Sequence, residues 1–207
     1  MTTRKFLRTA TAMAALAGIG LAGPSLASAS SVNSVIVTAT APYCGIHWGS
    51  MPQTRSASGV PDWFTQPADG SAVDNVRAGR HDCYDRLVID VLGSRPGYRV
   101  QYVDALAEYG VSGRGPAVPL LGGAFLEVMV PTNIGDADGY EIFTPPHRNQ
   151  LVNVAGWSTF RQVVEIGYYE TQRQFGLGVR GRLPFRVFTL DGPDDHSRLV
   201  IDVAHRW

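Results

Sequence analysis

The stretch GLGVRG, residues 176–181, has the spacing of a nucleotide-binding motif. In dinucleotide-binding folds, G-x-G-x-x-G opens a helix whose N-terminus holds the pyrophosphate. Here the motif continues as RLPFRVFTL, in which Pro184 and several β-branched or aromatic residues favour a strand. We therefore expect two glycine-containing strands joined by a turn, and no cofactor.

Motifs for a nucleophile or a metal ion are incomplete. Ser112 in GVSGR and Ser158 in GWSTF both lack the closing glycine of a nucleophile elbow. The chain has five histidines, but no two are spaced to share one helix face. The sequence therefore predicts no metal site and no catalytic residue.

One catalytic arrangement stays open as an alternative. His81 and Asp82 precede one apolar segment, and Asp194 and His196 precede another. If these side chains converged, they could serve an envelope hydrolase or bind a metal ion, whereas turn and capping hydrogen bonds are their ordinary use. Two carboxylates about 5–9 Å apart in a cleft could also hydrolyse a glycan. No acidic residue lies in a recognisable context for that reaction.

The N-terminal segment predicts export. Residues 1–29 begin with basic residues, continue with an apolar run and end in Ala-Ser-Ala, the pattern of a secretory signal peptide cleaved near Ala29. Glycines and a proline interrupt the run before it reaches the roughly 20 apolar residues of a membrane span. We expect a secreted protein outside the cytoplasm, in contact with the cell wall and without a membrane anchor after cleavage.

The predicted mature chain is slightly acidic. Without residues 1–29 it has 15 basic and 18 acidic residues, a net charge of −3. Because phosphate binding needs a basic surface, we expect no nucleic-acid partner. The remaining length is that of a single domain, and we expect a monomer.

Two cysteines, Cys44 and Cys83, lie in the predicted exported part. An oxidising compartment favours a bond between them, which would close a loop of about 40 residues and stabilise the fold by roughly 4 kcal/mol. The alternative is a reactive Cys83 thiolate activated by His81.

Two regions of the mature chain differ in composition. Residues 30–79 are rich in small and polar residues, which predicts an extended N-terminal arm tethered by any disulfide. Residues 80–207 contain short β-rich segments separated by Gly, Pro and Asp, which predicts an all-β fold, an antiparallel β-sandwich of seven to nine strands. Only YVDALAEYG, residues 102–110, has helical character, and it is too short to change the class.

The hexapeptide RLVIDV occurs twice, at residues 86–91 and 198–203. Alternate residues of a strand face opposite sides, so each copy has a Leu-Ile-Val face and an Arg-Val-Asp face. The first face suits a core. We expect both copies to be central strands that stabilise the domain.

The charges of the two copies allow two arrangements. If the copies pair directly and antiparallel, Arg86 opposes Asp202 and Asp90 opposes Arg198, which makes them candidate cross-strand ion pairs. Alternatively, the copies occupy equivalent positions in two different sheets of a pseudo-symmetric sandwich.

Aromatic side chains give the best indication of ligand binding. Aromatic platforms commonly hold sugar rings or peptides, although many aromatic residues simply pack in or around the core. We select Trp48, Tyr84 and Trp157 as candidate ligand-binding residues.

Several segments resemble the AMIN-like domain family of exported bacterial proteins. The segments are CGIHWGS, RAGRHDCYDRLVIDV, GYRVQYV, FGLGVRGRLPFRVFTLDGP and SRLVIDVAHRW, and the resemblance extends over nearly all of the predicted mature chain. AMIN domains proper are similar to it more remotely. They are β-sandwiches of two similar sheets that target cell-wall amidases and secretion pores to peptidoglycan.

The resemblance implies a secreted, non-catalytic module of the cell envelope with an all-β fold. Cys44 and Cys83 match cysteine positions of the family, which implies that they form the disulfide. The expected partner is a cell-wall glycan such as peptidoglycan, or an envelope protein that binds an exposed strand edge.

Overall fold

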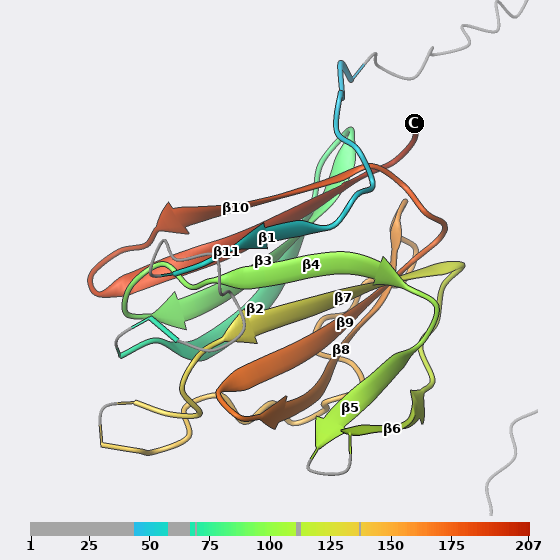
Figure 1. The fold of residues 1–207 in the computed structure, drawn as a ribbon. Coiled ribbons are helices and arrows are strands. Elements are labelled where there is room, and N and C mark those ends of the chain that lie inside the picture. Colours follow the sequence, from blue (N-terminus) through green and yellow to red (C-terminus); the bar gives the residue numbers. More distant parts are fainter. Residues whose placement is uncertain (1–43, 58–66, 69, 111–112, 137) are drawn as a thin grey trace, which may run out of the picture. The chain divides into compact units, whose positions relative to one another are not determined.

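The computed structural model describes residues 44–57, 67–68, 70–110, 113–136 and 138–207 (Figure 1). The predicted signal peptide and the first part of the predicted arm lie outside these ranges. The described residues form strands and loops without a helix. Accordingly, no helix long and apolar enough to cross a bilayer occurs among them.

The described strands form three antiparallel sheets. The five-stranded sheet has the order β1-β4-β7-β9-β8, the four-stranded sheet has the order β10-β11-β3-β2, and β5 and β6 form a hairpin. The all-β sandwich expected from the sequence is confirmed, with eleven strands in place of the predicted seven to nine. Their bounds are β1 Gln53–Arg55, β2 Ala72–Arg80, β3 Tyr84–Leu92, β4 Tyr98–Val103, β5 Leu106–Gly110, β6 Gly113–Val118, β7 Ala124–Pro131, β8 Phe160–Tyr169, β9 Gln172–Val179, β10 Phe185–Asp191 and β11 His196–Ala204.

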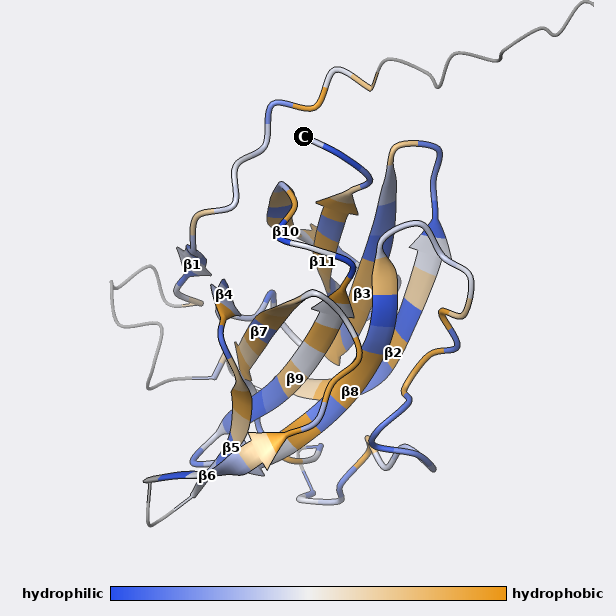
Figure 2. Cartoon of the chain, turned by 90° about the vertical axis from the view of Figure 1, so that its right-hand side faces the viewer, coloured by the Kyte–Doolittle hydropathy of each residue, from blue (hydrophilic) through white to orange (hydrophobic). Residues whose placement is uncertain are grey.

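The main core contains apolar residues of both the five-stranded and the four-stranded sheet. Figure 2 shows hydrophobic and hydrophilic bands along β3 and β11, and each strand has three consecutive apolar residues, Leu-Val-Ile. The Leu-Ile-Val faces of the two RLVIDV copies are fully buried in this core. These residues are Leu87, Ile89, Val91, Leu199, Ile201 and Val203.

A further layer covers the outer face of the five-stranded sheet. Leu106 of β5 packs there against apolar residues of β8 in a second, smaller core. A Cβ atom at Gly176 would lie 2.6 Å from Leu106, and one at Gly178 would collide with the carbonyl oxygen of Leu121. The glycines of GLGVRG therefore let the covering layer approach β9, and the motif continues towards another strand as expected.

The segment with helical character, residues 102–110, forms strands instead. It contains the end of β4 and all of β5, which pairs with β6. A helix this short gains little from its own hydrogen bonds. Cross-strand partners supplied by residues 113–118 satisfy the same backbone groups.

The edge of the four-stranded sheet at β10 is covered by residues 44–57, which we call the N-terminal clasp. The backbone N–H of Phe185 donates to the carbonyl of Gly49 at 2.8 Å. The Gln53 side chain continues this pairing, since its amide donates to the carbonyl of Phe185 and accepts from the N–H of Val187, both at 2.9 Å. Because β1 of the clasp pairs with β4, the clasp joins the two sheets along one side.

In the five-stranded sheet, the edge at β8 is covered by the connection between β7 and β8, residues 132–159. Its backbone forms two hydrogen bonds with the free edge of β8. The Leu151 N–H donates to the Val163 carbonyl, and the Glu165 N–H of β8 donates to the Arg148 carbonyl. These bonds occupy edge groups that would otherwise invite another strand. Long connections of this kind often carry functional sites.

Strand β1 and all but the last residue of β2 lie within residues 30–79, the segment predicted to be an extended arm. β2 pairs with β3 almost throughout, so the four-stranded sheet begins before the predicted boundary at residue 80. The composition of β2 hid this, because an edge strand with an exposed side carries many small and polar residues.

We expect Gly178→Ala to lower the free energy of unfolding by about 1–3 kcal/mol, because the added methyl group meets backbone that cannot easily move. Gly181→Ala in the same motif is the matched control, since nothing lies within 4 Å of a Cβ there. Urea unfolding of both variants measures the difference. Equal stabilities would contradict the close layer contact.

Candidate ligand-binding face

The two RLVIDV copies pair directly in the four-stranded sheet. β3 and β11 are antiparallel, with Arg86 opposite Asp202 and Asp90 opposite Arg198. Arg86 binds Asp202 through two hydrogen bonds of 2.6 and 2.9 Å. Arg198 lies 3.9 Å from Asp90, an ion pair with looser geometry. The alternative of two equivalent strands in different sheets is therefore wrong.

Side chains around Asp202 form what we call the aromatic–arginine cluster on the outer face of this sheet. The Asp202 carboxylate accepts hydrogen bonds from Arg86 of β3 and also from Nε of Arg186 of β10, the latter at 2.9 Å. Its members are Trp48, Tyr84, Arg86, Arg186, Phe188 and Asp202.

Aromatic rings surround the two guanidinium groups of the cluster. The Arg186 guanidinium lies 4.3 Å from the centroid of the Trp48 ring and 5.2 Å from that of Phe188. The Arg86 guanidinium lies 5.3 Å from the Tyr84 centroid. Trp48 and Tyr84 also meet edge to face, 5.6 Å apart. At these distances the rings attract the cations and hold both guanidiniums in place.

The third aromatic candidate, Trp157, lies elsewhere. Its ring stacks on Phe160 at the start of β8, at a centroid distance of 6.0 Å, and packs against the main core. The structure therefore brings Trp48 and Tyr84 together, and gives Trp157 a packing role in the 132–159 connection.

A disulfide between Cys44 and Cys83 holds the cluster together, as expected from the sequence. Cys44 begins the described part of the clasp, and Cys83 immediately precedes Tyr84. The bond therefore ties the segment that carries Trp48 to the strand that carries Tyr84 and Arg86. A reactive Cys83 thiolate is excluded because its sulfur is in the bond.

The cluster exposes cations and buries its carboxylate. The side chain of Asp202 is 0% exposed, whereas those of Arg86 and Arg186 are 24% and 42% exposed. Hydrogen bonds to Asp202 raise the pKa of Arg86, an effect that burial opposes. Asp202 thus orients two partly exposed guanidiniums, one of which, that of Arg86, also donates to the Tyr84 hydroxyl at 3.4 Å.

The four residues of the hydrolase alternative do not converge. His81 and Asp82 precede β3, whereas Asp194 and His196 lie at the start of β11, whose first residue pairs with Leu92 at the far end of β3. The two groups are separated by the length of β3, roughly 27 Å. In addition, His196 pairs with Asp74 at 3.1 Å. This version of the hydrolase hypothesis is wrong.

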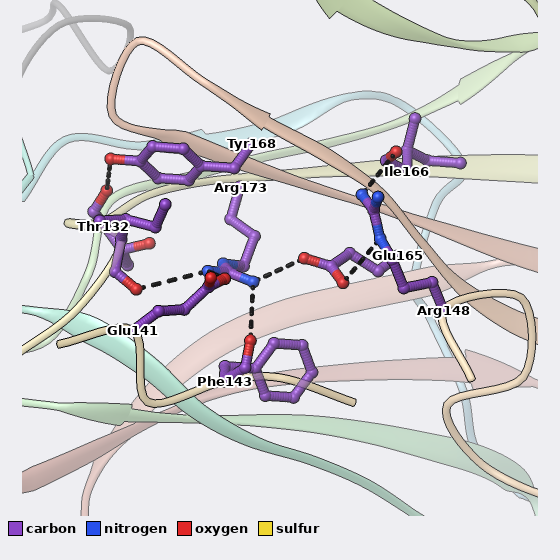
Figure 3. A network of polar contacts seen from close by, with 9 residues as sticks. Thr132, Glu141, Phe143, Arg148, Glu165, Ile166, Tyr168 and Arg173 are labelled. Atoms are coloured by element: carbon purple, nitrogen blue, oxygen red, sulfur yellow. Dashed lines mark hydrogen bonds and ion pairs between the residues drawn. The ribbon is translucent and has the colours of Figure 1, made fainter. Parts of the chain in front are cut away.

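A second polar site lies where the 132–159 connection meets β8 and β9 (Figure 3). Arg173 of β9 has a side chain only 1% exposed and binds Glu165 at 2.6 Å and Glu141 at 3.1 Å. The same guanidinium donates to the Phe143 carbonyl and lies 5.6 Å from the Tyr168 ring centroid. Burial raises the pKa of the Tyr168 hydroxyl. These contacts fix the connection to the sheet.

A cavity of about 390 Å³ adjoins this network. Glu141, Glu165 and Arg148 are among its lining residues. Glu108 lines the same cavity. Arg173 binds both Glu141 and Glu165 and so occupies the place between these two carboxylates where a glycosidic bond would have to lie. The network is therefore suited to hold the connection in place. Among the described residues, no three His, Cys, Asp or Glu side chains are arranged to hold a metal ion.

Sequence analysis missed Arg186 and Phe188 of the aromatic–arginine cluster and the whole Arg173 network. Arg186 and Phe188 alternate in FRVFTL, so strand periodicity predicts that they share a face. Nothing in the sequence shows that this face adjoins Trp48, because that contact joins segments more than a hundred residues apart. Arg173 has no local signal at all, since its two acidic partners come from other elements.

The architecture is that of an extended β-sandwich, in which a covered sheet faces a second sheet with a charged outer side. A profile of the AMIN-like domain matches residues 71–205, most of the chain. The chain therefore belongs to the AMIN-like domain family, whose members are extracytoplasmic modules associated with the cell envelope. Comparison with curated proteins and with solved structures gives no significant match.

We expect Arg173→Met to lower the free energy of unfolding by about 3–5 kcal/mol, because it leaves Glu165 buried with only an exposed partner, Arg148. The double variant Arg173→Met with Glu165→Met should lose less than the sum of the two single losses. Arg95→Met removes an exposed ion pair with Asp191 and should change stability little. Chemical denaturation of the set measures these values, and strict additivity would contradict a buried pair.

We expect replacement of both Cys44 and Cys83 by serine to lower the free energy of unfolding by about 4 kcal/mol, given the 39-residue separation. The clasp should also become accessible to trypsin at Arg55, which donates to Thr189 in the intact fold. Reduced wild-type protein should behave in the same way. Unchanged proteolysis at Arg55 would show that the clasp docks without the bond.

Proposed function

We propose that this protein is a secreted, non-catalytic module that binds a cell-wall glycan, with peptidoglycan as the expected ligand. Residues 1–29 would direct its export, and the AMIN-like domain would work in the cell envelope. Membership of the AMIN-like family and the Cys44–Cys83 disulfide support this location.

The aromatic–arginine cluster is the observation that carries the proposal. Aromatic rings pack against the C–H faces of sugars, and guanidinium groups donate hydrogen bonds to hydroxyl and carboxylate oxygens. Both kinds of group are present within one half-exposed cluster. Because Asp202 and the disulfide fix them in the free protein, little conformational entropy is lost when a ligand binds.

Binding of an envelope protein at β2 is the second candidate function. β2 is an outer strand of the four-stranded sheet, and in the described structure only Ala72 forms a bridge on its other side. Strand addition is a common mode of peptide binding. However, Arg77, Arg80 and the register shift after Val73 are features that discourage it, so we place this function second.

We expect Trp48→Ala to weaken binding to insoluble peptidoglycan by about tenfold, because it removes an aromatic platform and frees Arg186. Co-sedimentation of the mature protein with purified cell walls measures the bound fraction. Trp207→Ala is the matched control, since Trp207 is 73% exposed and outside the cluster. Circular dichroism verifies that both variants fold.

Two results would contradict the proposal. Wild-type protein that stays wholly in the supernatant does not bind the wall. Equal retention of the two tryptophan variants, at the wild-type level, would place any binding outside the aromatic–arginine cluster.

A further inference from the structure

The outer face of the four-stranded sheet holds a second group with the same construction as Asp202 and its arginines. Asp90 of β3 accepts two hydrogen bonds from Arg77 of β2, at 2.7 and 2.9 Å, and is paired with Arg198 of β11. Asp90 and Asp202 are thus each shared by two guanidiniums.

The arginines cover the carboxylates in both groups. The Asp90 side chain is 15% exposed, whereas those of Arg77 and Arg198 are 49% and 34% exposed. The hydrogen bond to Asp90 raises the pKa of Arg77. Four cations and two anions give these six side chains a net charge of +2, although the whole chain has none. These two groups are therefore a local excess of positive charge.

The two groups are separated along the strands by an apolar row. Arg86 and Asp90 lie four residues apart on β3, which corresponds to about 13 Å. Between them, Phe188 pairs with Val200, and Val200 pairs with Val88. Val88 and Val200 are buried, so Phe188 is the partly exposed member of this row. A ligand that contacts both groups must therefore be elongated. It needs an anionic group at each end of the contact, and the part between these groups must pack next to an apolar side chain.

We propose that the ligand of this face is an acidic glycan, a linear saccharide chain with carboxylates on its sugars or on their substituents, which contact the Asp202 and Asp90 groups together. The chain would lie along β3 and β11, with sugar rings over Trp48 and Phe188. This inference rests on the proposed function, which identifies the ligand as a glycan. It adds the charge of the ligand, the minimum length of the ligand and the direction in which the ligand lies on the sheet.

A charged glycan fits the face better than a neutral glycan or a simple polyanion. Guanidinium groups bind carboxylates and phosphates with two parallel hydrogen bonds, so the titration with polyphosphate below separates the two anions. The partly exposed rings of Trp48 and Phe188 favour sugar rings between the charges. A neutral glycan would use the rings but leave the excess positive charge without a partner.

The first experiment compares purified peptidoglycan before and after its carboxylates are coupled to ethanolamine as amides. We expect amidation to reduce co-sedimentation of the wild-type protein by about tenfold, and added salt to weaken binding to the untreated wall. Retention that resists both treatments would overturn the acidic ligand while leaving the proposed wall binding intact.

The second experiment uses soluble probes in calorimetric titrations. Oligogalacturonate should bind at least about tenfold more tightly than galacturonic acid, because only the oligomer can contact both arginine groups. Neutral maltooligosaccharides should bind more weakly than the acidic oligomer. Equal affinity for the monomer and the oligomer, or for polyphosphate and the oligomer, would overturn the proposal.

Variants of the two arginines that bind Asp90 test whether the ligand contacts this second group. Arg77→Gln and Arg198→Gln should each weaken oligogalacturonate binding about fivefold, with no change in galacturonic acid binding at the Asp202 group. Arg161→Gln is the matched control, because Arg161 lies on β8 of the other sheet. Thermal unfolding confirms that each variant folds. Wild-type affinity in a folded Arg77→Gln, Arg198→Gln double variant would overturn the two-group contact.

If the protein binds oligogalacturonate but no cell wall, the acidic-glycan inference stands and the peptidoglycan proposal fails. The two proposals therefore have separate tests.

Discussion

The antiparallel pairing of β3 with β11 is the contact on which the rest of the structure depends. It joins residues more than a hundred positions apart, and it sets the register for both faces of the four-stranded sheet. A shift by one residue would turn Leu87, Ile89 and their partners out of the core and turn Arg86 into it. The hydrophobic pattern and the Arg86–Asp202 pair favour the same register, so each reinforces the other.

Polar contacts join the two sheets of the sandwich at the margins of the apolar core. Asp85 is fully buried, accepts hydrogen bonds from the backbone N–H groups of Thr159 and Phe160, and lies 3.1 Å from Nε2 of His205. It thereby links β3 to the start of β8 in the other sheet. The clasp and the Arg173 network close the two sides in a comparable way. Pairing between buried polar groups at these positions favours one geometry of the two sheets.

The same rule explains how the candidate site is built. Carboxylates that point away from the core would ordinarily be solvated, yet Asp202 is covered by two arginines and by the aromatic rings above them. The arrangement stabilises the sheet and at the same time presents fixed cations and rings to solvent. The structural role and the proposed binding role therefore use the same side chains. Membership of the AMIN-like family supports the proposed location in the cell envelope, whereas the proposed chemistry of the ligand rests on the face itself.

The sequence by itself determined the features that depend on short-range patterns. Period-two alternation, frequent turn residues and two cysteines in a predicted exported chain specify a disulfide-bonded β-sandwich, and the repeated RLVIDV limits the pairing of its copies to two arrangements. Contacts between distant segments were decided only by tertiary structure. Direct pairing of Arg86 with Asp202, the approach of Arg186 to Trp48, and the burial of Arg173 between Glu141 and Glu165 all depend on strand order. Strand order follows from the packing of the whole chain, because many strands share the same alternating pattern and no local signal distinguishes one partner from another.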